Sequence, residues 1–261
     1  MKRVNHFLLA ACHLLLIACL LFSCRKPEVG IAGQSHAGNS SDSVRYADNF
    51  RIETHDGYTL ATVRNPWDTG KILQRYVLVP KTAALPDSLP EGTLIRTPLE
   101  RTVSYGSVQC SFFDEFGALS TLAGVCEPQY INIPFVQEGV QQGRIANLGQ
   151  AANPDLEKIM LIEPEALFTA PIEGFGYGQV TQLGIPLIEC VDYMEASPLG
   201  RTEWIRFYAL FFDQRAVADS LFRETESRYR QLQDLASEVV HRPTVMAETI
   251  YRGVWYIPGG R

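Results

Sequence analysis

Histidine is scarce in this chain of 261 residues, and its distribution argues against several kinds of site. Beyond the first 24 residues only His36, His55 and His241 remain, and none lies between residues 56 and 240. Because imidazole is a common metal ligand and general base, this gap disfavours a bare zinc or manganese site and a Ser-His-Asp hydrolase. The sequence also lacks G-x-S-x-G, H-E-x-x-H and nucleotide-loop motifs. We therefore expect no catalytic residue, no resident metal ion and no cofactor.

Cysteine and positive charge are also sparse in the part expected to fold. Three of the six cysteines lie in the first 24 residues, which leaves Cys110, Cys126 and Cys190. These are too few and too scattered for a disulfide framework or a C-x-x-C metal site, although one disulfide among them stays open. Without Lys2 and Arg3, 21 basic side chains stand against 29 acidic ones, a formal charge of -8. Such an acidic body argues against a nucleic-acid partner.

Only one long apolar run occurs, from Phe7 to Phe22, and it follows a basic start. Its length and position predict a secretory signal over residues 1–23, not a spanning helix. The sequence Leu21-Phe22-Ser23-Cys24 resembles the bacterial lipobox, so Cys24 is expected to be lipidated on the periplasmic side of the cell envelope. A plain signal peptide cleaved elsewhere is the alternative. Residues 24–43 are rich in Gly, Ser and Asn, which predicts a flexible tether, so the membrane would be reached through the lipid alone.

The body begins with a β-rich pattern over residues 44–91. Apolar residues alternate with polar ones on both sides of Asp56-Gly57, which predicts a β-hairpin with a type I′ turn. A further strand is predicted at Tyr76 to Val79, ahead of Pro80. We interpret residues 44–91 as a small β-rich lead-in.

The pattern changes at Gly92 to short apolar runs that alternate with helical segments, which predicts an α/β lobe with a mainly parallel sheet over residues 92–200. Expected strands are 102–105, 166–170 and 186–191, and expected helices are 110–122, one opened by Asn153-Pro154, and 177–183. Two helices follow at 201–212 and 214–240, the second about 40 Å long, enough to brace two lobes. Residues 242–261 would start a second α/β lobe, so we expect a chain truncated from a longer protein.

Three stretches resemble the substrate-binding lipoproteins of bacterial ABC importers for ferric siderophores, cobalamin and haem. The resemblance covers roughly residues 92–261, and Glu165 stands where the family usually has aspartate. The stretches are Arg101-Thr102-Val103-Ser104-Tyr105-Gly106-Ser107, then Asn153-Pro154-Asp155-Leu156-Glu157-Lys158-Ile159 with Glu163-Pro164-Glu165-Ala166-Leu167, and Gln182-Leu183-Gly184-Ile185-Pro186-Leu187.

The resemblance implies a two-lobed periplasmic-binding fold in which the ligand lies between the lobes, against loops at the carboxyl ends of strands. Rigid aromatic side chains in those loops suit a large planar or chelated ligand, and arginine suits its anionic groups. For each of these residues a place in the core, on the surface or in a local ion pair is the alternative. The candidate ligand-binding residues are Ser104, Tyr105, Ser107, Phe175, Tyr177, Tyr193, Arg201, Arg252, Trp255 and Tyr256.

The resemblance also implies docking onto a membrane permease, with separate ATPase subunits, through one surface glutamate in each lobe. Glu157 matches this position in the first lobe, whereas on sequence alone it is one solvated acid among many. The expected function is that of a lipid-anchored, non-enzymatic receptor for a metal chelate: a ferric siderophore first, then cobalamin or haem. Two alternatives stay open. One is an extracytoplasmic α/β hydrolase with catalytic groups from the missing part or from His55 and His241, and the other is a glycan-binding module presenting Asn65-Pro66-Trp67.

Overall fold

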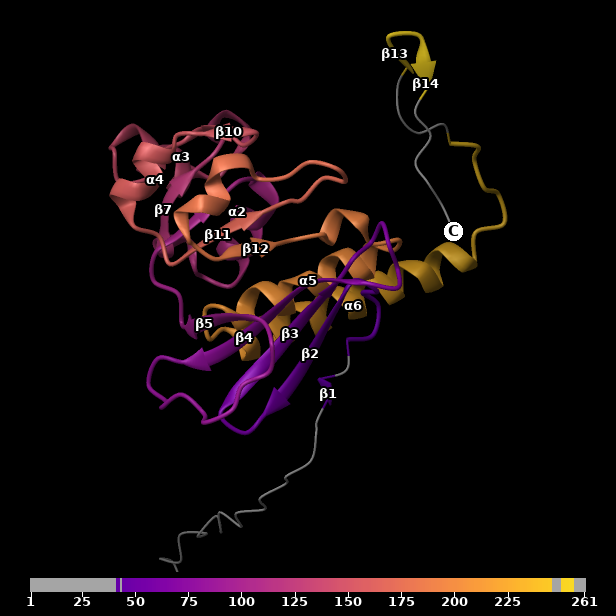
Figure 1. Ribbon diagram of the computed structural model, residues 1–261. Coiled ribbons are helices and arrows are strands. Elements are labelled where there is room, and N and C mark those ends of the chain that lie inside the picture. Colours follow the sequence, from indigo (N-terminus) through magenta and orange to yellow (C-terminus); the bar gives the residue numbers. More distant parts are fainter. Residues whose placement is uncertain (1–40, 43, 246–249, 256–261) are drawn as a thin grey trace, which may run out of the picture. The chain divides into compact units, whose positions relative to one another are not determined.

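The computed structural model describes residues 41–42, 44–245 and 250–255, and its first sheet contains the β-rich start of the body (Figure 1). Five strands follow one another in sequence order, antiparallel except for the parallel last pair. The predicted hairpin and the strand before Pro80 are confirmed. The type I′ turn is wrong, because such a turn needs positive φ at both loop residues and only Gly57 has it, at 82°. The strands are β1 (Ser41–Asp42), β2 (Phe50–His55), β3 (Tyr58–Arg64), β4 (Ile72–Pro80) and β5 (Thr93–Thr97).

The second sheet is wholly parallel and confirms the predicted α/β class. Its order is β12-β11-β6-β7-β8, so the first strand along the chain lies in the middle. Alternate residues of the strands enter two clusters, Phe168 on one face and Leu167 on the other, so both faces are covered. The strands are β6 (Thr102–Ser104), β7 (Leu122–Val125), β8 (Ala146–Asn147), β11 (Ala166–Thr169) and β12 (Leu187–Glu189). A hairpin, β9 (Gly149–Gln150) with β10 (Asn153–Pro154), follows β8.

The helices around this sheet differ from the predictions at their ends. Helix α2 covers Ser107–Glu115 and does not reach residue 122, because Gly117, at φ 80°, turns the chain toward β7. Asn153 lies in β10 and is not the helix cap. Asp155 caps α4 (Leu156–Ile162) by accepting a hydrogen bond from the Lys158 backbone N–H at 3.1 Å. The segment predicted as a helix over 177–183 is the 3-10 helix η3 (Gly178–Leu183), and α3 (Pro134–Gln141) was not predicted.

Helix α5 (Pro198–Leu210) joins the two sheets into one hydrophobic core. Its Phe207 ring lies 6.1 Å from the Tyr76 ring of β4, while its Tyr208 ring lies 6.1 Å from the Phe168 ring of β11. Strand β5 pairs with β4 across the boundary expected at residues 91/92. Burial of each large aromatic side chain stabilises this core by about 2 kcal/mol. The β-rich lead-in therefore shares a core with the α/β lobe, through the side chains of α5.

Two buried carboxylates of this region hold the chain that leads into β2. Glu203 of α5 accepts hydrogen bonds from the backbone N–H groups of Arg45 (3.0 Å), Tyr46 (2.7 Å) and Ala47 (2.9 Å). Glu195 accepts from the next two N–H groups, at 2.9 Å each, and from Trp204 Nε1. Two carboxylates that accept from backbone N–H groups thereby fix residues 45–49 to the region around the start of α5.

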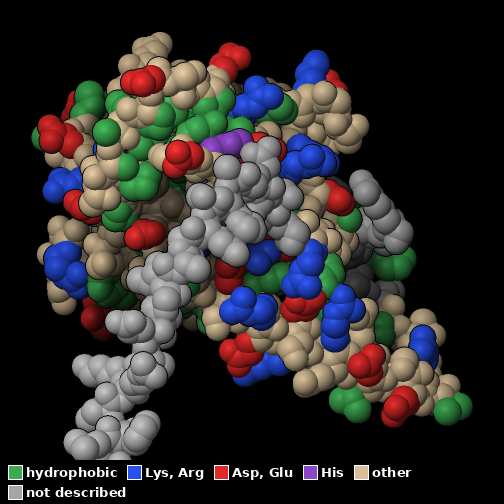
Figure 2. Space-filling model, turned by 90° about the horizontal axis from the view of Figure 1, so that it is seen from below, with side chains coloured by type: hydrophobic (Ala, Val, Ile, Leu, Met, Phe, Trp, Pro, Cys, Tyr) green, Lys and Arg blue, Asp and Glu red, His purple; other side chains and the backbone are tan. Residues whose placement is uncertain are grey.

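Helix α6 (Arg215–Ser237) is buried only at Ala218 and Phe222. Its apolar residues near the end are exposed, Leu232 by 65% and Leu235 by 63%. Basic and acidic side chains are intermixed on the face that Figure 2 shows. Of the expected second lobe the structure describes residues 242–245 and one hairpin, β13 (Ile250–Tyr251) with β14 (Val254–Trp255). In the described ranges no helix is long and apolar enough to span a bilayer.

Candidate functional site

A cavity of about 400 Å³ lies at the carboxyl edge of the parallel sheet. Tyr105 follows β6, Glu127 follows β7, and residues 170–177 follow β11, so three strand ends contribute to one site. Parallel strands bring all their carboxyl ends to the same edge, which is where α/β sheets bind ligands. The lining residues of this edge cavity are Tyr105, Glu127, Ala151, Ala152, Pro154, Ala170, Pro171, Ile172, Phe175, Gly176, Tyr177 and Val180.

Tyr105 is a largely buried residue of the edge-cavity lining. Its backbone N–H donates to the Phe168 carbonyl at 3.0 Å, which fixes the residue to the end of β11. The side chain is only 7% exposed and packs in the cluster with Val103 and Cys126. Its buried hydroxyl has no hydrogen-bond partner among the described residues, and burial raises the pKa of the phenol. A buried polar group without a partner is costly, so this hydroxyl is a candidate contact for a ligand or water.

The loop over residues 171–176 carries exposed apolar side chains at the cavity. Phe175 is 76% exposed and Ile172 is 62% exposed. The Phe175 N–H donates to the Ile172 carbonyl at 3.0 Å, and Gly174, at φ 75°, allows the tight turn between them. Large apolar side chains held in water by an ordered turn are typical of a binding surface.

Tyr177 lines the cavity, and its hydroxyl is held by hydrogen bonds to neighbouring side chains. The hydroxyl accepts a hydrogen bond from Thr169 Oγ1 at 3.0 Å and donates one to Glu189 Oε1 at 3.1 Å. Burial raises the pKa of both Tyr177 and Glu189. The Glu189 N–H in turn donates to Tyr76 Oη at 2.7 Å, so the network reaches β4 of the first sheet. The ring is thus preorganised, which lowers the entropic cost of binding.

Glu127 was not predicted as a site residue. Its backbone lies in the left-handed region at φ 50°, where its N–H donates to the Gly149 carbonyl at 2.8 Å. Glu127 follows the apolar run Leu122–Val125 and precedes Pro128, a pattern that marks the end of a strand and could have indicated this position. The prediction missed it because the start of that run was assigned to a helix.

The other predicted residues lie at different places. Ser104 is fully buried in the central strand, where its Oγ donates to the Gly106 carbonyl at 2.9 Å, so it cannot contact a ligand in the edge cavity. Ser107 is the first residue of α2 and is absent from the cavity lining. Arg252 and Trp255 lie in the β13–β14 hairpin and do not line this cavity. Tyr256 and Cys24 fall outside the described residues.

Tyr193 and Arg201 support the cavity loop from outside. The Tyr193 hydroxyl donates to the Pro171 carbonyl, and Arg201 Nη2 donates to the Tyr193 carbonyl at 2.6 Å. Burial raises the pKa of Asp192, and the positive charge of Arg201 offsets only part of this rise. The two residues therefore position residues 171–176 and do not line the cavity. Glu157, the predicted docking residue, is exposed in the first turn of α4.

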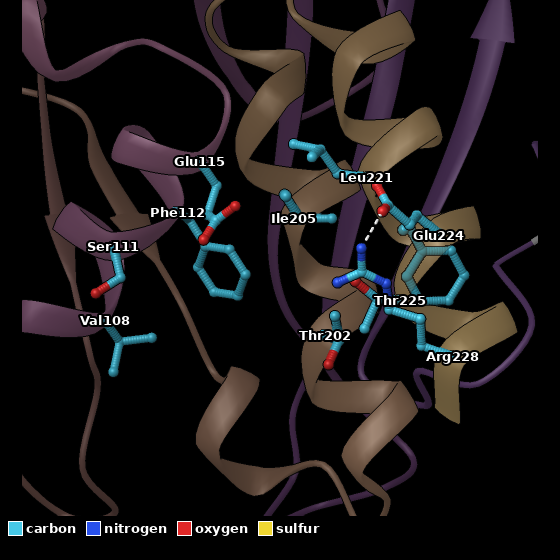
Figure 3. Close-up of a pocket in the computed structure, with 11 residues that line it drawn as sticks. Val108, Ser111, Phe112, Glu115, Thr202, Ile205, Leu221, Glu224, Thr225 and Arg228 are labelled. Carbon is cyan, nitrogen blue, oxygen red and sulfur yellow. Dashed lines mark hydrogen bonds and ion pairs between the residues drawn. The ribbon is translucent and has the colours of Figure 1, made fainter. Parts of the chain in front are cut away.

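A second cavity, of about 490 Å³, lies between α2, α5 and α6 (Figure 3). Phe112 of α2 and Ile205 of α5 line this cavity, and on α6 Arg228 forms an ion pair with Glu224 at 2.5 Å. It is the larger cavity, but helix faces form it and no strand end reaches it. The edge cavity combines three strand ends, the exposed ring of Phe175 and an unpartnered buried hydroxyl, so we take it as the candidate functional site. In the described ranges no group of three His, Cys, Asp or Glu side chains could hold a metal ion.

No family model matches the chain. It is 23% identical over 248 residues to the uncharacterized lipoprotein MJ0878 of Methanocaldococcus jannaschii, which covers 84% of this chain and 58% of that protein. It is 24% identical over 218 residues to a second uncharacterized lipoprotein of that organism, MJ0872, covering 78% of this chain and 52% of the relative. The chain thus spans little more than half the length of these two relatives.

The structural neighbours are periplasmic binding proteins for ferric siderophores, haem and vitamin B12. The petrobactin-binding protein YclQ of Bacillus subtilis is 13% identical, with a TM-score of 0.48 and coverage of 68% of this chain and 53% of that one. The siderophore-binding protein BauB is 18% identical, with a TM-score of 0.46 and coverage of 57% and 52%. A periplasmic haem-binding protein of Pseudomonas aeruginosa is 19% identical, with a TM-score of 0.42 and coverage of 53% and 47%.

Proposed function

We propose that the chain is a lipid-anchored receptor that captures a metal chelate, a ferric siderophore first and cobalamin or haem next, and delivers it to the permease of an ABC importer. The observation that carries the proposal is the edge cavity, where Tyr105, Phe175 and Tyr177 come from two different strand ends of one parallel sheet. Rigid aromatic side chains in a partly apolar cavity suit a large, flat or compact ligand.

The cavity offers apolar surface and aromatic rings, with few polar side chains among them. Its titratable side chains are Tyr105, Tyr177 and Glu127, and burial raises the pKa of both phenols, which disfavours their ionised forms. Glu127 is the one carboxylate of the lining, and the lining includes no histidine, cysteine or serine with which it could form a catalytic pair. Binding without turnover is the function that such a lining supports best.

A titration of the natural full-length protein, purified in detergent, tests the proposal. The ligands are ferric hydroxamates, a ferric tricatecholate, cobalamin and haem, followed by tryptophan fluorescence and by equilibrium dialysis. We expect saturable binding of one chelate, weakened about twofold to tenfold by Phe175→Ala because an aromatic contact contributes roughly 0.5–1.5 kcal/mol. Leu161→Ala is the matched control, since Leu161 is 80% exposed on α4 and outside the cavity lining. Absence of binding to every chelate by a folded protein would overturn the proposal.

The envelope location rests on Cys24 and on the relatives, two of which are named lipoproteins. We expect Cys24→Ser to abolish incorporation of radiolabelled palmitate and to release the protein from membranes. Undiminished labelling of this variant would contradict the anchor.

Docking onto a permease is proposed at Glu157, whose exposed position in the first turn of α4 leaves its carboxylate open to a basic partner. We expect Glu157→Gln to reduce chelate-stimulated ATPase activity of the reconstituted importer and to leave chelate affinity unchanged. Glu138→Gln, an exposed acid on α3, is the control. Equal stimulation by both variants would remove Glu157 from the docking surface.

A further inference from the structure

The edge cavity contains one charged side chain, and its sign bears on the ligand. Glu127 is the acid, and the lining includes no lysine or arginine. We propose that Glu127 makes the receptor select chelates that present a neutral or cationic, hydrogen-bond-donating face to this cavity, and reject polyanionic chelates. This inference rests on the proposed function, because it concerns the class of chelate captured at the same site.

The backbone places Glu127 at the cavity at an energetic cost. A non-glycine residue at φ 50° is in a conformation that glycine or asparagine adopts more easily. Two hydrogen bonds hold it there: its N–H donates to Gly149 at 2.8 Å, and its carbonyl accepts from the Tyr130 N–H at 3.0 Å. The carboxylate is therefore carried by a fixed turn at the end of β7, not by a mobile loop.

Arg201, the arginine predicted to bind an anionic ligand group, is engaged elsewhere in the protein. Arg201 donates to the Tyr193 carbonyl at 2.6 Å and interacts electrostatically with Asp192. A second acid lies near the cavity, because Glu173 is exposed in the loop over residues 171–176. A chelate with several negative charges would meet the like charge of Glu127 on this wall, which disfavours association and slows the encounter.

The hydrogen-bonding capacity of Glu127 fits the same ligand class. A carboxylate only accepts hydrogen bonds, so amide or ammonium groups on the ligand can donate to Glu127 in the edge cavity. Carboxylate or catecholate oxygens of a ligand would face Glu127 without a proton between them.

The test compares chelates that share one scaffold and differ in charge. Ferrioxamine B is cationic, its N-acetyl form is neutral and its N-succinyl form is anionic, while the iron centre stays the same. Cobalamin is paired with its monocarboxylic acid, and haem dimethyl ester with haem. Dissociation constants are measured by equilibrium dialysis at low and high salt with the full-length protein in detergent.

For whichever scaffold binds, we expect the least negative member to bind roughly tenfold more tightly than the most negative one. This preference should shrink to within about twofold in Glu127→Gln, and high salt should reduce it in the wild type. Glu138→Gln, an exposed acid on α3, should keep the wild-type preference. If Glu127→Gln does not fold, Glu127→Asn removes the charge with a residue that suits the left-handed backbone.

The outcomes separate the two claims. Tightest binding of an anionic member, binding of a ferric tricatecholate alone, or an unchanged charge preference in both Glu127 variants would overturn this inference and leave the receptor function standing. Failure of every chelate to bind would overturn the receptor function and this inference with it.

Discussion

The phenol hydroxyl of Tyr177 donates a hydrogen bond to Oε1 of Glu189 at 3.1 Å, across the carboxyl ends of β11 and β12. The ring of Tyr177 lines the edge cavity, whereas its hydroxyl belongs to a network with Thr169 and Tyr76. The binding surface and the packing of the two sheets are thus connected through a few hydrogen bonds. Changes in this network should be visible in stability as well as in affinity.

The first prediction concerns the pH dependence of stability. Burial raises the pKa of Glu189 above its ordinary value of 4.5. Its contribution to stability is therefore complete below that ordinary value and is lost as the pH rises through the raised pKa. Glu189→Gln stays neutral, so its free energy of unfolding relative to the wild type should increase from about pH 4 to pH 8. Urea unfolding across this range measures the difference, and a difference that stays constant would contradict it. Glu173→Gln, an exposed acid in the same region, should follow the wild-type profile.

The second prediction concerns the buried carboxylate of Glu203. Glu203→Ala leaves three backbone N–H groups of residues 45–47 without their acceptor, and hydrogen bonds to a charged group contribute about 1.5–3 kcal/mol each. Since these bonds are not additive, we expect a total loss of about 3 kcal/mol or more in the free energy of unfolding. Glu224→Ala, in an exposed ion pair on α6, should change it by less than about 1 kcal/mol. Equal effects of the two substitutions in denaturant titrations would refute the role of Glu203.

The third prediction concerns the thiols. Cys110, Cys126 and Cys190 are free and fully buried, and burial raises the pKa of Cys110 to about 11 and that of Cys126 to about 12. Thiolates are the reactive form, so the native body should react with a disulfide reagent at neutral pH far more slowly than the unfolded chain. Mass spectrometry after alkylation, with and without denaturant, counts the modified sites. Rapid labelling of any of the three in the folded protein, or a disulfide among them, would contradict the structure.

The fourth prediction separates positioning from contact. Tyr193→Phe removes the hydroxyl that holds the Pro171 carbonyl but takes nothing from the cavity lining. We expect affinity for the bound chelate to fall about threefold to tenfold because the loop over residues 171–176 loses a fixed point. The free energy of unfolding should change by only about 1 kcal/mol. Tyr130→Phe, at a 70% exposed tyrosine, is the comparison, and an equal loss of affinity in it would argue against a specific role of Tyr193.

Sequence reasoning found strands in both sheets where short apolar runs had clear ends. Ala166 to Thr169 in the parallel sheet and the β2–β3 hairpin in the first sheet are examples. It failed at residues 116–125, because Leu119 and Leu122 continue the helical spacing of Phe112 and Phe116. The break is made by Gly117 in a left-handed conformation, which a periodicity argument does not register.

The candidate site was predictable only in part, because a sequence pattern locates backbone elements better than it locates side-chain contacts. Strand ends can be located approximately, and the resemblance to the binding-protein family then placed Tyr105, Phe175 and Tyr177 in loops at the edge of the sheet. Side-chain direction depends on neighbours in space, so the sequence could not tell that Arg201 holds the Tyr193 carbonyl or that Ser104 is enclosed. Glu127 was not predicted as a site residue because the strand that precedes it, Leu122–Val125, was not predicted either.

The attachment of residues 45–49 to Glu203 and Glu195 has a mechanical consequence. A pull on the chain upstream of residue 44 would load the first of these backbone hydrogen bonds together, since three of them converge on one carboxylate. Bonds that share a load in parallel resist it better than bonds that open one after another. Force that has passed β1 would therefore enter α5, and through it the common core, before it could peel away strands β2 to β5 of the first sheet.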